Sequence, residues 1–110
     1  MPLYVGDTYT FSIMDVYTCR YQISRDNGST WTTIAEDVAA VVANEGEDNE
    51  TVTNSYEWTI TGPVATQCLI KFVDQDDDAE YIGAEVFEIM LTVTFGGKKK
   101  KTKLHRLIYA

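Results

Sequence analysis

Basic residues are scarce through most of this 110-residue chain. Residues 1–95 contain only three, Arg20, Arg25 and Lys71, against all 17 acidic residues, which gives that stretch a formal charge of −14. So acidic a surface repels the phosphates of nucleic acid, and we expect no nucleic acid partner. Residues 96–110 hold no acidic residue and all the remaining basic ones, which are Lys98, Lys99, Lys100, Lys101, Lys103 and Arg106.

The residues on which catalysis depends are also few. The single histidine, His105, lies among basic residues, whereas a hydrolytic triad needs a histidine between an acid and a nucleophile. Paired carboxylates of the glycosidase kind would have to come from loop tips with no aromatic cleft around them. Cys19 and Cys68 are far apart and have no metal-binding spacing. We therefore expect no enzyme activity, no catalytic or metal-binding residues and no cofactor.

Long apolar runs are missing as well. No segment approaches the roughly 18 apolar residues of a membrane span, so we expect none. The start of the chain, MPLYVGDTY, has neither the basic nor the apolar region of a secretory signal, which indicates a protein made in the cytoplasm.

What the chain has in abundance is alternation of polar and apolar residues, which predicts strands. Asn27-Gly28 lies between two such runs and predicts a tight hairpin, because both central residues of a type I′ turn need positive φ. Residues 38–42 favour a short strand over a helical turn, and residues 44–50 and 74–80 are expected to be solvated acidic loops. Strands are expected over residues 8–13, 17–24, 31–34, 56–60, 68–73, 86–95 and 104–109.

Strands this short, separated by turns every 8–12 residues, predict an all-β antiparallel sandwich over residues 1–95. Residues 96–110 are expected to form a basic C-terminal arm with a final strand. The alternation also predicts which side chains face the core: Tyr9, Phe11 and Ile13; Tyr17, Cys19, Tyr21 and Ile23; Tyr56, Trp58 and Ile60; Cys68, Ile70 and Phe72.

Three motifs in these strands carry a family resemblance. They are Ser24, Asn27, Gly28, Thr30 and Trp31; then Tyr56, Trp58 and Thr59; then Cys68, Ile70 and Asp74, with Phe72 where a valine is usual. The pattern resembles the immunoglobulin-like or fibronectin-III-like modules of bacterial surface proteins and phage structural proteins, over roughly residues 8–89. The resemblance implies an immunoglobulin-like sandwich that serves as a spacer, an adhesion unit or a virion part, with no catalytic site.

The chain departs from that family at both ends. Only seven residues precede the strand at Thr8, so the usual first strand is missing or very short, and residues from about Leu91 onward have no counterpart. A missing first strand leaves a sheet edge exposed. The C-terminal strand is a candidate to cover this edge, within the chain or in a neighbouring copy.

Three further features have ordinary alternatives. The resemblance places the strands of Cys19 and Cys68 side by side, where a disulfide could form, but a protein made in the cytoplasm stays reduced, which favours two buried thiols. The loop Asp74–Glu80 faintly resembles a calcium loop but has Ala79 where such a loop needs glycine. Asn27 and Asn49 begin glycosylation sequons, yet turn geometry accounts for Asn27-Gly28.

We interpret the chain as a non-enzymatic structural or interaction protein. The lysine run Lys98–Lys101 is either a solvated hairpin tip or a surface that docks on the acidic body of another subunit. The expected setting is a phage virion, as a capsid decoration or tail protein that binds other virion subunits or copies of itself. The alternative is an adhesion or carbohydrate-binding module of a larger protein on the bacterial cell surface. Exposed aromatic rings would favour that alternative, but the aromatic residues mostly alternate inward.

Overall fold

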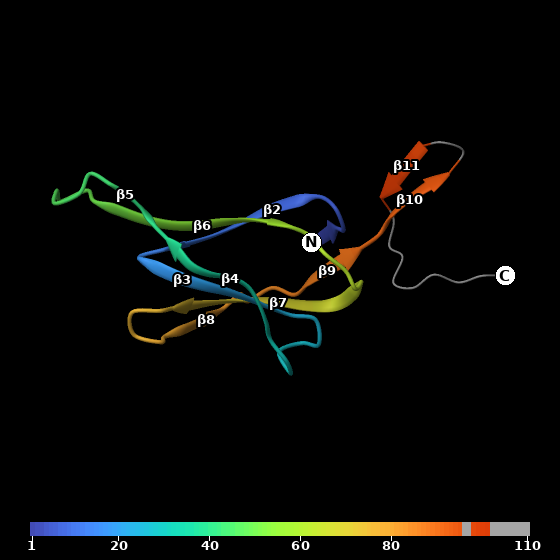
Figure 1. Cartoon of the computed structure of the whole chain (residues 1–110), viewed down its shortest axis with the longest axis horizontal. Coiled ribbons are helices and arrows are strands. Elements are labelled where there is room, and N and C mark those ends of the chain that lie inside the picture. The colour runs from blue at the N-terminus through green and yellow to red at the C-terminus, as the bar shows by residue number, and fades with distance from the viewer. Residues whose placement is uncertain (96–97, 102–110) are drawn as a thin grey trace.

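The computed structural model describes residues 1–95 and 98–101, and all regular structure within them is β-strand (Figure 1). The strands are β1 (Pro2–Tyr4), β2 (Thr8–Met14), β3 (Thr18–Ser24), β4 (Thr32–Ala39), β5 (Val41–Ala43), β6 (Thr51–Thr59), β7 (Ala65–Asp74), β8 (Glu80–Ile82), β9 (Phe87–Met90), β10 (Thr92–Phe95) and β11 (Lys98–Lys101). Two sheets pack face to face, and a separate two-stranded hairpin follows them. The predicted all-β sandwich with a C-terminal β extension is confirmed.

The larger sheet has the order β1-β9-β7-β3-β4, and β8 also pairs with β7. The smaller sheet has the order β2-β6-β5. Neighbouring strands are antiparallel except β1, which runs parallel to β9. The chain crosses from one sheet to the other at Ala40, between β4 and β5. Residues 38–42 are therefore β-structure, as predicted, but they do not form one strand. They belong to the end of β4 and the start of β5, which lie in different sheets.

The core lies between the two sheets and contains most of the side chains that alternation assigned to it. Cys19, Tyr21 and Ile23 are almost fully buried, and so are Trp58 and Ile60. The assignment of Tyr17 is wrong, since its side chain is 51% exposed and Val16 is buried in its place. Asp15 has φ of +63° just before this point, and the resulting change of chain direction breaks the alternation.

The Asn27-Gly28 turn forms as predicted, with positive φ at both residues and a hydrogen bond from Ser29 N–H to the Asp26 carbonyl. It is the tip of a longer loop, because the pairing of β3 with β4 ends at Ile23 opposite Thr32. Asp26 holds the loop together. Its carboxylate accepts hydrogen bonds from the Thr30 hydroxyl and backbone N–H, which lower the pKa of Asp26 to about 2.

The run of residues 86–95 is not one strand. It is divided at Leu91 into β9, which belongs to the sandwich, and β10, which pairs only with β11. The division has a physical cause. Met90 is fully buried and its carbonyl accepts a hydrogen bond from Val5 N–H, which is the last bond that the larger sheet makes to this run. Residues beyond it have no partner in the sandwich among those described.

Cys19 and Cys68 are free and buried, so the candidate disulfide is wrong. Their strands β3 and β7 are neighbours, but Cys19 lies opposite Asp74, six residues along β7 from Cys68. At ~3.3 Å per residue this separates the two cysteines by about 20 Å, whereas a disulfide needs Cα atoms within about 7 Å. Burial raises the pKa of both thiols, which keeps them protonated and unreactive.

A buried polar contact joins the two sheets through the core. The Tyr21 hydroxyl on β3 donates to Asn54 Oδ1 on β6 at 2.5 Å, and Asn54 Nδ2 donates to the Val38 carbonyl on β4 at 2.7 Å. Tyr21 and Asn54 are both fully buried. Burial raises the pKa of Tyr21, so the phenol remains a donor at all ordinary pH values. The contact fixes the position of one sheet relative to the other.

This bridge predicts that Tyr21→Phe destabilises the fold by about 1–3 kcal/mol, since it leaves the buried Asn54 oxygen without its donor. Urea unfolding measures the change. Tyr56→Phe is the matched control, because Tyr56 is a partly buried tyrosine packed against the same core, and its variant should unfold near the wild-type midpoint. Equal midpoints for Tyr21→Phe and the control would contradict a structural role for the bridge.

Candidate docking site

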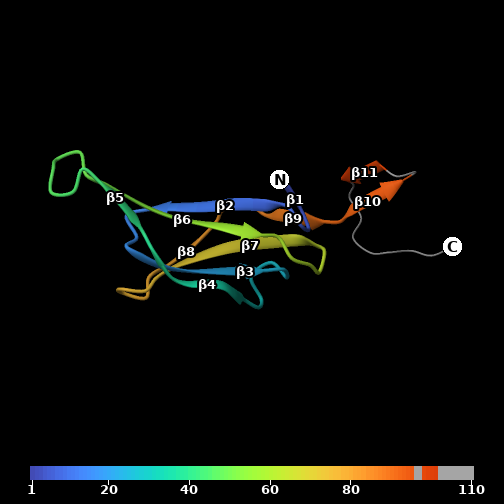
Figure 2. The same ribbon diagram turned by 45° about the horizontal axis from the view of Figure 1, so that its top comes forward.

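The charged residues of the molecule are separated along its long axis. The β5–β6 loop, residues 44–50, carries four carboxylates, and the β7–β8 loop carries five more over Asp74–Glu80. Figures 1 and 2 both show these two loops at the same end of the sandwich, opposite the β10–β11 hairpin. We call the two loops, together with Asp15, the acidic end.

Backbone geometry gives the first acidic loop its shape. Asn44 and Gly46 both have positive φ, and Glu47 N–H donates to the Asn44 carbonyl at 3.0 Å. The Glu50 carboxylate turns back and accepts a hydrogen bond from Gly46 N–H at 2.8 Å. The sequence expectation of a solvated loop holds, since every residue from 43 to 51 is exposed.

The second acidic loop uses some of its carboxylates to cap backbone N–H groups. Asp74 Oδ1 accepts from Asp76 N–H, and Asp77 Oδ1 accepts from Ala79 N–H. Within the described residues no group of three or more acidic, histidine or cysteine side chains is arranged to hold a metal ion. The structure thus offers no support for calcium at Asp74–Glu80.

The acidic end perturbs the tyrosine that lies beside it. The Tyr17 hydroxyl lies 3.5 Å from Glu50 Oε1. The negative charge of Glu50 raises the pKa of Tyr17, and Asp15 and Glu45 add to the effect. Because Tyr17 is exposed, this shift reports the field that an approaching cation would meet at this surface.

The basic residues of the sandwich offset only one carboxylate of this end, because the contacts of the other two lie elsewhere. Arg20 pairs with Glu36 at 3.1 Å, and Lys71 lies 3.5 Å from Glu80. Arg25 donates to the carbonyls of Thr61, Gly62 and Pro63. Of these three partners only Glu80 belongs to the acidic end.

The lysine run lies at the far end of the molecule. Lys98–Lys101 form β11, which pairs antiparallel with β10, with Lys98 opposite Phe95 and Lys101 opposite Thr92. The run is thus a strand rather than the tip of a hairpin. Lys103, Arg106 and His105, and the final strand expected over residues 104–109, lie outside the described residues. The acidic end and the lysine strand therefore lie at opposite ends of the folded molecule (Figure 1).

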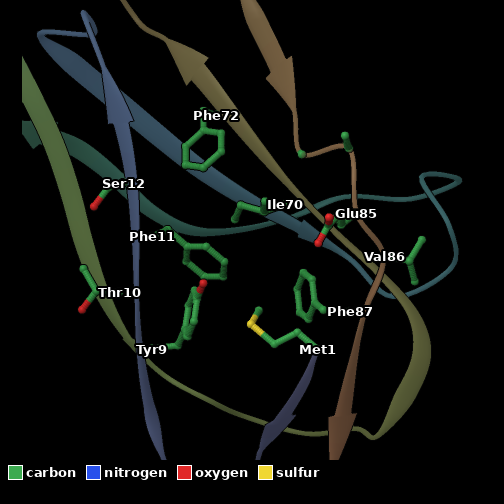
Figure 3. A pocket seen from close by; sticks show the side chains of 12 residues that line it. Met1, Tyr9, Thr10, Phe11, Ser12, Ile70, Phe72, Glu85, Val86 and Phe87 are labelled. Atoms are coloured by element: carbon green, nitrogen blue, oxygen red, sulfur yellow. The ribbon is translucent and has the colours of Figure 1, made fainter.

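A cavity of about 290 Å³ opens on one side of the sandwich between β2 and the segment that joins β8 to β9 (Figure 3). Figure 3 shows the rings of Phe11, Phe72 and Phe87 gathered around it, with Met1 below and Glu85 at the rim. The sequence predicted only the exposed sheet edge beside this cavity, from the missing or very short first strand. β1 covers the edge of β9 but leaves β2 unpaired on the side away from β6 among the described strands.

The aromatic residues give little support to a carbohydrate site. Among residues 1–92 the most exposed rings are Tyr17 (51%) and Tyr81 (47%), of which Tyr17 precedes β3 and Tyr81 lies on β8. The Trp31 ring is covered by the Lys71 ammonium group, 4.3 Å from its centroid, so this face cannot stack on a sugar. The part of the chain that the structure describes also contains no helix long and apolar enough to cross a membrane.

The field at the acidic end predicts that Glu50→Gln lowers the pKa of Tyr17 toward its ordinary value of about 10. Nuclear magnetic resonance of ¹³C-labelled tyrosine during an alkaline titration measures it, with Tyr17→Phe identifying the signal. The matched control is Glu57→Gln, an exposed glutamate on β6 outside the acidic end. A Tyr17 titration that Glu50→Gln leaves unchanged would contradict the negative field.

A scan against protein-family models, a search of curated proteins and a search of solved structures found no match for this chain.

Proposed function

We propose that this protein is a non-enzymatic structural protein that docks on neighbouring subunits through its basic C-terminal arm. The observation that carries the proposal is the separation of charge along the molecule. The acidic end and the lysine strand lie at opposite ends of the folded molecule, so neither can reach the other within one copy. Each can pair with the oppositely charged surface of a neighbouring molecule. Complementary patches of this kind steer association and select its orientation.

The arrangement favours contact from head to tail. The lysine strand of one copy meets the acidic end of the next, and the second copy presents its own lysine strand to a third. Two different surfaces then form every interface, which builds a ring if the rotation closes and a filament if it does not. Rings and filaments of small repeated domains are the architecture of a virion tail or of a decorated shell.

The virion setting also draws on the immunoglobulin-like pattern. The order β2-β6-β5 against β9-β7-β3-β4 is compatible with the two sheets of an immunoglobulin-like sandwich, in which β1 is a short first strand. We accordingly propose a phage virion component, as a capsid decoration or tail protein, with other virion subunits or copies of itself as partners.

The experiment is sedimentation velocity of the full chain over a series of protein concentrations, from about 50 to about 500 mM salt. We expect self-association at low salt that weakens as salt rises. The variant in which Lys98, Lys99, Lys100 and Lys101 are all serine should associate more weakly by roughly fourfold or more, since four surface ion pairs contribute ~0.2–1 kcal/mol each.

The matched control replaces the same four lysines by arginine, which keeps the charge and should keep the association. Association that is insensitive to salt and equal in the serine variant would overturn the docking role of the arm. A chain that stays monomeric at low salt could still bind a different virion subunit, so the wild-type and serine chains are also compared for binding to purified particles. Equal binding, or none, would contradict the proposal.

A further inference from the structure

The unpaired edge of β2 is the most unusual feature of the sandwich that the charge separation does not explain. β2 is seven residues long and pairs only with β6 among the described strands. An exposed strand edge of this length presents a row of free backbone N–H and C=O groups, which invites another strand to pair with it. Directly beside it lies the cavity lined by Tyr9, Phe11, Phe72, Val86 and Phe87.

The combination of a free edge and an apolar cavity selects the kind of occupant. A strand added to β2 satisfies the backbone groups, and alternate side chains of that strand enter the cavity. The rim adds an electrostatic preference, because Glu85 is exposed there and forms no ion pair within residues 1–95. The occupant should therefore be an extended segment with alternating apolar residues and a positive charge.

The chain itself contains such a segment after Lys101. The sequence continues Thr-Lys-Leu-His-Arg-Leu-Ile-Tyr-Ala, in which an extended strand places Leu104 and Ile108 on one face with the basic Arg106, and Leu107 and Tyr109 on the other face with Lys103. Its nine residues are enough to span the seven of β2, and it carries no acidic residue. It thus supplies both the apolar side chains and the charge that the groove calls for.

The position of the hairpin indicates that the segment comes from a second copy. The hairpin begins beyond Met90, at the end of the sandwich that the Val5–Asp7 turn closes through bonds to Met90 and Ile60. The lysine strand is therefore at the end of the sandwich where β2 begins, whereas the acidic end lies where β2 finishes. Suppose that the lysine strand of a neighbour is docked on the acidic end. Its C-terminal segment then begins close to Met14, where β2 finishes beside the β5–β6 loop.

The same geometry gives the strand direction. A tail that starts at Met14 and extends toward Thr10 runs antiparallel to β2, as β6 does on the other side. Antiparallel addition is the more stable ladder per residue and extends the smaller sheet to four strands.

We propose that the groove beside β2 binds the C-terminal segment, residues 102–110, of a second copy of this chain as an added antiparallel strand. The inference rests on the proposed function, because it identifies the partner of the arm as another copy. It also assigns different roles to two parts of the arm. The lysine strand steers the approach of the two copies, and residues 102–110 stabilise the contact once it has formed.

The test is disulfide cross-linking between full-length chains. Ser12 is exposed on β2 and lines the cavity, so Ser12→Cys marks the groove. Leu104→Cys, Leu107→Cys and Tyr109→Cys mark the tail at three registers in separate chains. A Ser12→Cys chain is mixed with each tail variant at low salt under mild oxidation, and mass spectrometry of the digested products identifies the bridge. Adjacent strands place Cα atoms within the range that a disulfide needs.

We expect an interchain bridge from position 12 to at least one tail position. Thr33→Cys is the control, because residue 33 is also exposed but lies on β4 in the other sheet. Val86→Lys in the Ser12→Cys chain should lower the bridge yield by roughly tenfold, because it puts an unpaired charge in the groove, whereas Val86→Ala should lower it little.

Three results would overturn the inference. The first is equal bridging at Thr33→Cys. The second is a bridge that forms only within one chain in the Ser12→Cys/Leu107→Cys double variant, which would assign the tail to its own groove. The third is normal salt-sensitive association in sedimentation with no bridge to position 12, which would leave the docking function standing without the added strand. An absence of self-association would overturn the added strand, whereas the proposed docking function would then be decided by the particle-binding comparison.

Discussion

The burial of one face of each sheet against the other determines where everything else in this molecule lies. Because the strands of both sheets run along the same long axis, their connections are concentrated at the two ends (Figure 1). The Tyr21–Asn54 contact inside the core then fixes one sheet relative to the other. Acidic residues cannot be buried in such a core, so they lie on exposed strand faces and, for the most part, in the connections. The charge separation therefore follows from the placement of two acidic loops at one end and of the chain's C-terminal hairpin at the other.

The alternation of residues was enough to predict the architecture, because a period of two is read directly from sequence. The core faces of β3 and β7 and the Asn27-Gly28 turn were found in this way. The errors have local causes. Tyr17 follows Asp15, whose positive φ changes the direction of the chain, and a positive φ at aspartate has no unique sequence signal. The break at Leu91 depends on where the partner strand β1 ends, which is tertiary information.

The docking surfaces were only half visible in the sequence. The charge counts of residues 1–95 and 96–110 predicted an electrostatic partner, but they did not place the two acidic loops, 29 residues apart from Glu45 to Asp74, at one end. The short first strand predicted an exposed edge, yet the cavity beside it depends on Phe72 and Phe87, which come from strands distant in sequence. The buried Asn54 was missed altogether, because the expected strand began only at Tyr56 and the partner of Asn54, Tyr21, lies in the other sheet.

The central claim is that the basic arm of one copy binds the acidic end of another, and a charge exchange tests it most directly. One full-length variant replaces Lys98–Lys101 by glutamate, and a second replaces Glu45, Glu47, Asp48 and Glu50 by lysine. Sedimentation at low salt should find that each variant alone associates far more weakly than wild type, because its arm and its β5–β6 loop now carry the same sign. An equimolar mixture should associate again, because each arm then finds a β5–β6 loop of opposite sign on the other variant. Wild-type association by either variant alone, or none in the mixture, would contradict the account.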